Sequence, residues 1–315
     1  MTGKRTETPT LGPVNLQHLR AFVKVVDEGS FGRAALELGV SQAAVSKAVQ
    51  ALERELGVRL LERGRHGARP TAVGTRVLAK ARVMLQLKAG LEQEAALERD
   101  RAHGGVRGEL TLAVFESFSK RILPGLLARL RELHPDLHVR LVPVPETLEG
   151  YTRALTDGTV QVAFGAWQVP QACIGWVLMT DRHLVLLPPG TRTTADELDY
   201  PDVADMPLVM VADSECSARL RAHLESEGRN VGSTLVAHGN EAVMEMVAQG
   251  LGAAILPELA AQPLPDQVRT VPFRGLVRPI NVVLPPHGLK VPAVRALLGV
   301  VKERFPTSEL PVLPL

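Results

Sequence analysis

The stretch VSQAAVSKAVQALE, residues 40–53, constrains the fold of this chain more tightly than any other segment. With 100° of rotation per residue, one narrow stripe of a helix through it carries Val45, Val49, Leu52 and Leu56. The opposite face carries Ala43, Ser46, Lys47, Gln50 and Arg54. Ser41 occupies an N-cap position and Gly57 follows the last apolar residue, so we expect a helix over about 42–56. One face of this helix belongs to a core, and the other faces water or a partner.

A solvated surface is the ordinary explanation for such a polar face, but the preceding residues favour a partner. In SFGRAALELGVS, residues 30–41, Ser30 can cap a short helix and Gly39 allows a tight turn. Two short helices joined by a glycine-containing turn form a helix-turn-helix, whose second helix enters the DNA major groove. On that helix, Gln42, Ser46 and Gln50 can bond to base edges. Lys47 and Arg54 can meet phosphate or guanine.

The flanking segments complete a small DNA-binding domain. NLQHLRAFVKVVDEG, residues 15–29, has apolar residues at helical spacing and can close a three-helix core. The segment after Gly57 is broken by glycines and carries Arg59, Arg63, Arg65 and Arg69, which is typical of a wing over the phosphate backbone. From Thr71 to about residue 97, a single apolar seam predicts a long helix that suits a dimer partner.

This region resembles the LysR-type transcriptional regulators. The residues that carry the resemblance are FVKVVDEGSFGRAALELGVSQAAVSKAVQALERELGVRLLER, followed by RPTAVG. The departures from the family pattern are minor: Ala43 stands where Pro is usual, Gly32 where Thr or Ser is common, and Leu61 where Phe is common. The candidate DNA-binding residues are Ser30, Arg33, Ser41, Gln42, Ser46, Lys47, Gln50, Arg54, Arg63, Arg65 and Thr71.

The resemblance also implies partners. It implies a transcriptional regulator, not an enzyme, that needs no cofactor and binds double-stranded promoter DNA and a small-molecule effector. It further implies a homodimer through the long helix and a homotetramer through the effector lobes, and it leaves room for contact with RNA polymerase.

Composition agrees with a cytoplasmic protein of more than one domain. The chain has 315 residues, 45% of them apolar, which is ample for packed cores. Residues 1–99 carry 16 Lys and Arg against 10 Asp and Glu, whereas the remainder carries 20 against 24, so the positive end is the end with the helix-turn-helix. No apolar run approaches the roughly 20 residues of a membrane helix, and we expect no membrane association. Two cysteines do not make a disulfide framework.

Beyond residue 105, strand-like and helix-like segments alternate. Strands are predicted at GELTLAVF, LHVRLVPV, VQVAFGAW, HLVLLPP, PLVMV, STLVAHG and GAAILP, and SKRILPGLLARLRELHP reads as one amphipathic helix stopped by Pro135. This alternation predicts parallel sheets of the doubly wound kind. The family resemblance implies two α/β lobes of periplasmic-binding-protein type, with crossovers near Thr180 and Val277 and a ligand cleft between the lobes.

The expected fold class is therefore an α+β multidomain chain. It begins with a disordered tail at 1–13 and a winged helix-turn-helix at 14–72. A linker helix follows at 73–104, and a bilobed α/β effector domain at 105–315. We expect lobe 1 to cover about 105–179 and 278–315, and lobe 2 about 180–277.

Topology indicates where an effector would bind. Ligands of open parallel sheets sit at the carboxyl ends of strands, beside helix N-termini whose amides favour anions. Those places, together with the positions the family implies, give the candidates Ser117, Phe118, Thr147, Asp213, Glu215, Cys216 and Asn240. Ser117 and Thr147 can equally serve as helix caps, and capping is compatible with ligand contact.

Cys216 admits two interpretations. In DSECSARL it occupies the position that holds the reactive cysteine in the peroxide-sensing branch of the family. A helix N-terminus and nearby arginines would lower the thiol pKa, although Glu215 opposes them. That branch usually has a resolving cysteine nine residues later, where this chain has Glu225. We favour an ordinary small residue in an effector pocket, with a single-cysteine peroxide sensor as the alternative.

Other functions find little support in the sequence. His134 and His138 are four residues apart, but Pro135 keeps them from sharing a helix face, so we expect no metal site. GLG at 250–252 precedes a strand and lacks the spacing of a dinucleotide loop. An enzyme would need a nucleophile, a base and oxyanion donors, to which nothing points. A transport-type binding protein would lack the DNA-binding head.

Overall fold

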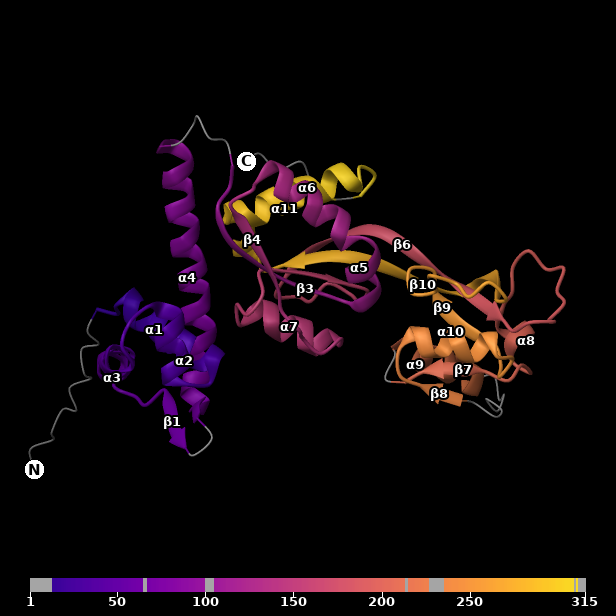
Figure 1. Cartoon of the computed structure of the whole chain (residues 1–315), viewed down its shortest axis with the longest axis horizontal. Helices are drawn as coiled ribbons and strands as arrows, with labels where there is room; N and C mark the ends of the chain where they lie inside the picture. Colours follow the sequence, from indigo (N-terminus) through magenta and orange to yellow (C-terminus); the bar gives the residue numbers. More distant parts are fainter. Residues whose placement is uncertain are drawn as a thin grey trace, which may run out of the picture.

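The computed structural model describes residues 13–64, 67–99, 105–212, 215–226, 235–308 and 310. They form a helical head, one long helix and two α/β lobes, with the head and the second lobe at opposite ends of the molecule (Figure 1). None of the described helices combines the length and the hydropathy needed to cross a membrane.

The head consists of three helices and a hairpin: α1 (Leu16–Glu28), α2 (Phe31–Leu38), α3 (Gln42–Leu56), β1 (Leu61–Gly64) and β2 (Gly67–Pro70). Helix α3 has the predicted bounds, because the Ser41 hydroxyl accepts from the amide of Ala44 at 3.2 Å and Gly57 ends the helix with a φ of 67°. The two strands pair antiparallel, so the basic segment forms a wing. Phe22 and Leu52 are fully buried in the core that the helices share.

The long helix α4 (Ala72–Arg99) leaves the head directly after the wing. Thr71 fixes its start, since the hydroxyl donates to the carbonyl of Arg59 at 3.0 Å and accepts from the amide of Gly74 at 2.9 Å. The first turns of α4 join the head core through Leu78 and Ala81. Farther along, the helix lies beside lobe 1 (Figure 1).

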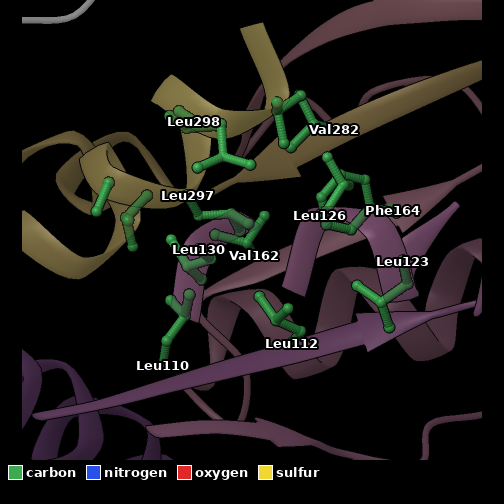
Figure 2. Packing of buried hydrophobic residues seen from close by; sticks show 14 of the residues in the cluster. Leu110, Leu112, Leu123, Leu126, Leu130, Val162, Phe164, Val282, Leu297 and Leu298 are labelled. Carbon is green, nitrogen blue, oxygen red and sulfur yellow. The ribbon is translucent and has the colours of Figure 1, made fainter. Parts of the chain in front are cut away.

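Lobe 1 is an α/β layer structure. Its elements are β3 (Gly108–Val114), α5 (Glu116–Arg121), α6 (Leu123–Leu133), β4 (Leu137–Leu141), α7 (Leu148–Thr156), β5 (Val162–Gly165), η1 (Pro286–Lys290) and α11 (Pro292–Arg304). Strands β4, β3 and β5 are parallel neighbours. Side chains of α6 and α11 meet those of the sheet in one core, where Leu126, Phe164 and Leu297 lie together (Figure 2). Full burial of such side chains contributes about 1.5–3 kcal/mol each.

Two long strands connect the lobes. Strands β6 (Ile174–Leu187) and β10 (Arg269–Leu284) run side by side through both lobes (Figure 1). They pair antiparallel, with Thr180 opposite Pro279. The main sheet has the order β4-β3-β5-β10-β6-β9. It is therefore mixed and not wholly parallel as the alternation of elements predicted, because one long strand leaves lobe 1 and the other returns to it.

Lobe 2 is smaller and closes over the far ends of these strands. Its elements are α8 (Tyr200–Val203), β7 (Val209–Val211), α9 (Glu215–Ser226), β8 (Leu235–Ala237), α10 (Asn240–Ala248) and β9 (Ala254–Pro257). Strands β7 and β8 are parallel, and β9 pairs antiparallel with β6. Two apolar clusters, around Val203 and Val243, form its core.

The single helix predicted after the first effector-domain strand is in fact two. Helix α5 ends at Arg121, and Ile122 separates it from α6. Pro124 lies in the first turn of α6, where a residue without an amide hydrogen is tolerated. In the interior of one continuous helix the same proline would remove a hydrogen bond and clash with the preceding turn, so the helix begins anew here. Helix α6 ends at Leu133, before Pro135, as expected.

Candidate DNA-binding surface and effector cavity

Helix α3 presents its polar face to solvent. The side chains of Gln42, Lys47, Gln50 and Arg54 are exposed, and Ser46 is half-buried beside them. Their mutual contacts are long: Gln50 Nε2 donates to the Ser46 hydroxyl at 3.5 Å, and Arg54 Nε donates to the carbonyl of Gln50 at 3.4 Å. Bonds of this length are weak, so they hold the side chains of Gln50 and Arg54 only loosely.

Other predicted DNA-binding residues also hold the head together. Ser30 accepts from the amide of Arg33 at 3.5 Å and thereby caps α2. The guanidinium of Arg33 donates to the carbonyl of Glu28 at the end of α1. Ser41 and Thr71 are caps as described above. The side chain of Arg63 and the whole of Arg65 lie outside the described residues.

The sequence did not reveal how the wing is attached to α3. Glu53 Oε1 accepts from the amides of Leu60 and Leu61 at 2.8 and 3.2 Å. A carboxylate that accepts two amides makes a strong, charge-assisted tether. It keeps the wing at a fixed place relative to the polar face of α3.

A cavity of about 320 Å³ lies between the two lobes. Lobe 1 contributes Phe115, Glu116, Ser117, Glu146, Tyr151 and Trp167 to its wall; lobe 2 contributes Ser217, Arg219, Asn240 and Ile255; and the long strands contribute His183, Leu276 and Arg278. Both lobes therefore face one partly open space. A small molecule in that space would contact both lobes at once.

Arg278 is the most constrained charge in this wall. Its Nε and Nη2 donate to Asp181 at 2.8 Å, and Nη2 also donates to the Ser117 hydroxyl at 3.0 Å. Its guanidinium lies 5.0 Å from the ring centre of Phe115. Burial raises the pKa of Asp181, and the positive charge of Arg278 opposes that shift. This network joins both long strands to α5 at the edge of the cavity.

Three residues of the wall each have a buried polar atom without a hydrogen-bond partner among the described residues. The atoms are Tyr151 Oη, Trp167 Nε1 and His183 Nε2. Leaving such a group unsatisfied costs about 1–3 kcal/mol, and none of the three atoms has surface that water can reach. None of them was predicted. Trp167 follows β5, where the strand-end rule could have found it; Tyr151 and His183 carry no signal in the sequence.

The predicted effector residues divide into two groups. Ser117 and Asn240 line the cavity. Phe118 does not: it is fully buried and stacks on Phe164, with ring centres 4.5 Å apart. Thr147 caps α7 by accepting from the amide of Gly150 at 3.1 Å, and it lines an adjoining hollow of about 510 Å³ instead.

The remaining effector candidates can be placed only in part. Asp213 lies outside the described residues. Glu215 and Cys216 are the first two residues of α9, and their side chains lie outside the described set. The other cysteine, Cys173, is buried, and burial raises the pKa of its thiol.

The part of the chain that the structure describes contains no group of three or more His, Cys, Asp or Glu side chains suited to a metal ion. His134 has a structural role, because its Nδ1 accepts from the amide of Val106 at 3.1 Å in the core of lobe 1. Burial lowers the pKa of this imidazole, which agrees with its being neutral and an acceptor.

Two family models match the chain. The LysR substrate binding domain matches residues 103–306, and the bacterial regulatory helix-turn-helix protein of the lysR family matches residues 16–75. The chain belongs to the LysR family. This LysR-family protein is a DNA-binding transcriptional regulator with an effector-binding domain, and not an enzyme.

Full-length relatives support the assignment to the LysR family. The probable HTH-type transcriptional regulator LrrA of Synechococcus elongatus is 36% identical over 295 residues, which cover 93% of this chain and 98% of the relative. A probable hydrogen peroxide-inducible genes activator of Mycobacterium leprae is 31% identical over 251 residues, covering 77% of this chain and 78% of the relative.

Solved structures of the family share the fold. A full-length OxyR variant from Pseudomonas aeruginosa has a TM-score of 0.74 at 22% identity, covering 92% of this chain and 95% of that one. Full-length CbnR in a complex with its target DNA has a TM-score of 0.53 at 22% identity, covering 92% and 99%.

Proposed function

We propose that this LysR-family regulator reads promoter DNA with the exposed face of α3 and is controlled by a small molecule held between its lobes. The observation that carries the proposal is that one chain contains both surfaces. Gln42, Lys47 and Gln50 lie exposed on a capped helix, and polar side chains of both lobes, such as Ser117 and Asn240, line the interlobe cavity.

Electrostatics and geometry support this assignment of α3. Lys47 lies among uncharged polar side chains, and the exposed Arg59 and Arg69 of the wing region can reach phosphates on either side. One helix covers only a few base pairs, too few to specify a genomic site. We therefore infer a dimer through α4 and a tetramer through the effector lobes, acting in the cytoplasm. RNA polymerase is a further partner of such an assembly at a promoter.

Replacing Lys47 tests the DNA-binding assignment. Lys47→Glu places a negative charge where the groove potential is already negative, and losing a good base contact alone costs about 1–3 kcal/mol. We expect affinity for DNA from the promoter beside the gene to fall about tenfold or more in gel-shift titrations at fixed salt, with the melting temperature unchanged. Lys290→Glu, the same charge change on exposed η1, is the control. Equal affinity of wild type and Lys47→Glu contradicts the assignment.

The likeness to the probable hydrogen peroxide-inducible genes activator of Mycobacterium leprae supports a second candidate, peroxide sensing by Cys216. Cys216 is the second residue of α9, where the helix dipole favours a thiolate. Glu225, nine residues later, provides no second thiol. An oxidised Cys216 would persist as a sulfenic acid or as a mixed disulfide with a small thiol.

A further inference from the structure

One lysine joins the two lobes at the rim of the interlobe cavity. Lys120, on α5 of lobe 1, has its Nζ 2.8 Å from Oε1 of Glu116 and 2.7 Å from Oε1 of Glu241. Glu116 lies one turn earlier on α5, whereas Glu241 lies in the first turn of α10 in lobe 2. A carboxylate from each lobe therefore shares one ammonium group.

A narrow hollow adjoins this lysine. Its volume is about 10 Å³, the least that holds one water molecule, and Lys120 and Glu241 are among the residues that line it. It shares Glu116, Ser117 and Asn240 with the wall of the interlobe cavity. The contact between Lys120 and Glu241 therefore lies at a rim of the cavity, beside polar residues of both lobes.

The strands that connect the lobes are irregular on both sides of their crossover. The pairing of β6 with β10 shifts register between Phe273 and Val277, and again between Ile280 and Asn281. The crossover at Thr180 lies between these two places. Irregular pairing bends strands, so this region is suited to be the hinge about which the lobes turn. A turn that separates α5 from α10 would break the contact of Lys120 with Glu241.

The strength of this contact is that of an exposed ion pair. The side chains of Lys120 and Glu241 are 49% and 74% exposed, so their attraction is weak and is screened by salt. The hydrogen bond from Lys120 lowers the pKa of Glu241, so both groups are charged at neutral pH. Such a pair cannot lock the lobes, but it can shift an equilibrium between open and closed lobes about two- to fivefold.

We propose that Lys120 is a latch, which shifts the unliganded protein toward closed lobes through Glu241 while Glu116 holds the lysine in place. The inference rests on the effector site proposed above and concerns its regulation. A cleft that is already closed in part of the molecules requires less closing free energy from the effector. The latch therefore raises the apparent affinity for a ligand that contacts both lobes.

Pulsed electron paramagnetic resonance measures the separation of the lobes without an effector. Spin labels at the exposed positions Arg131 of α6 and Glu245 of α10, each changed to Cys, report the distance between lobe 1 and lobe 2. Cys173 and Cys216 are changed to Ser, and labelled chains are diluted with unlabelled ones so that only distances within one chain are recorded. We expect Lys120→Glu to raise the ratio of open to closed lobes about two- to fivefold. Sodium chloride at about 1 M should shift the unchanged latch in the same direction.

Exchanging the two charges isolates the ion pair. Lys120→Glu combined with Glu241→Lys restores opposite charges across the rim and should restore the original distance distribution. Arg129→Glu is the matched control, since the partners Glu132 and Glu303 both lie in lobe 1. Melting temperatures show whether each variant is folded.

Two outcomes overturn the latch: an unchanged distribution in folded Lys120→Glu, or a double variant that stays as open as the single one. Neither DNA nor an effector is present in these measurements. Failure of the latch therefore leaves the proposed effector site and DNA-binding surface standing, and gel shifts with the same samples report on DNA binding separately.

Discussion

At the scale of single residues, Cys216 separates the two candidate effectors. Peroxide would transfer one oxygen to the Cys216 thiolate, giving a sulfenic acid and releasing hydroxide. Cys216→Ser removes that chemistry while keeping the size and polarity of the side chain. We favour a small-molecule effector. We therefore expect transcription from the target promoter to be the same in wild type and Cys216→Ser, both in the absence and in the presence of peroxide.

The control for this prediction is Cys173→Ser. Cys173 is buried in lobe 1, and burial raises the pKa of its thiol, which disfavours the reactive thiolate. A peroxide response that is present in wild type and in Cys173→Ser but absent in Cys216→Ser would establish the redox alternative.

Single residues also show which parts of a site a sequence can predict. The caps at Ser30 and Ser41 could be predicted because caps are local and obey fixed spacing, whereas Thr71 was predicted only as a DNA-binding residue. Ser117 and Asn240 followed from the rule that strand ends meet at one edge. His183 was not predictable, because its role depends on the carbonyl of Leu276, which lies 93 positions away in the chain. The prediction that Phe118 contacts the effector was wrong, because Phe118 packs on Phe164, which is likewise distant in sequence.

At the scale of elements, helix α4 has an apolar stripe that the described residues of the chain leave partly exposed. Met84, Leu87 and Leu91 recur at steps of three and four and are 44%, 37% and 72% exposed. Side chains at these steps share one face of a helix. Exposed leucines and methionine along a single stripe are typical of a seam that a second helix covers.

We expect the double change Met84→Glu and Leu91→Glu to separate the dimer, because it places charges in a seam that would be buried. Sedimentation should show monomers at concentrations where wild type is dimeric, and operator binding should weaken steeply on dilution. Glu92→Lys, a charge change at an exposed position next to Leu91, is the control. A wild-type monomer that protects a two-fold symmetric DNA site would contradict the dimer.

The two long strands explain why the prediction of a parallel sheet was wrong. The repeating order of strand and helix is shared by parallel and mixed sheets, and strand direction is decided by where the chain crosses between lobes. β6 and β10 span both lobes, so their antiparallel pairing depends on contacts such as Thr180 with Pro279, about a hundred residues apart. Periodicity contains no information on such pairs.

At the scale of the whole molecule, Arg82 on α4 connects the head with lobe 1. Its guanidinium pairs with Asp27 of α1 and donates to the Thr159 hydroxyl at 2.6 Å, with Asp157 3.7 Å away. One turn on, Gln86 donates to the carbonyl of Gly158 at 2.9 Å. These contacts place one side chain between the domain that reads DNA and the domain that holds the cavity.

Arg82→Ala should therefore loosen both contacts together. The side chain is only 14% exposed and bonded on both sides, so its removal should cost about 1–3 kcal/mol through the groups left unpaired. We expect faster amide hydrogen exchange at the end of α1 and around residues 157–159, whereas exchange in α10 stays as in wild type. Arg129→Ala is the control, since the ion-pair partners of Arg129 among the described residues, Glu132 and Glu303, both lie inside lobe 1. Faster exchange in lobe 1 alone would show that Arg82 does not couple the head to the effector domain.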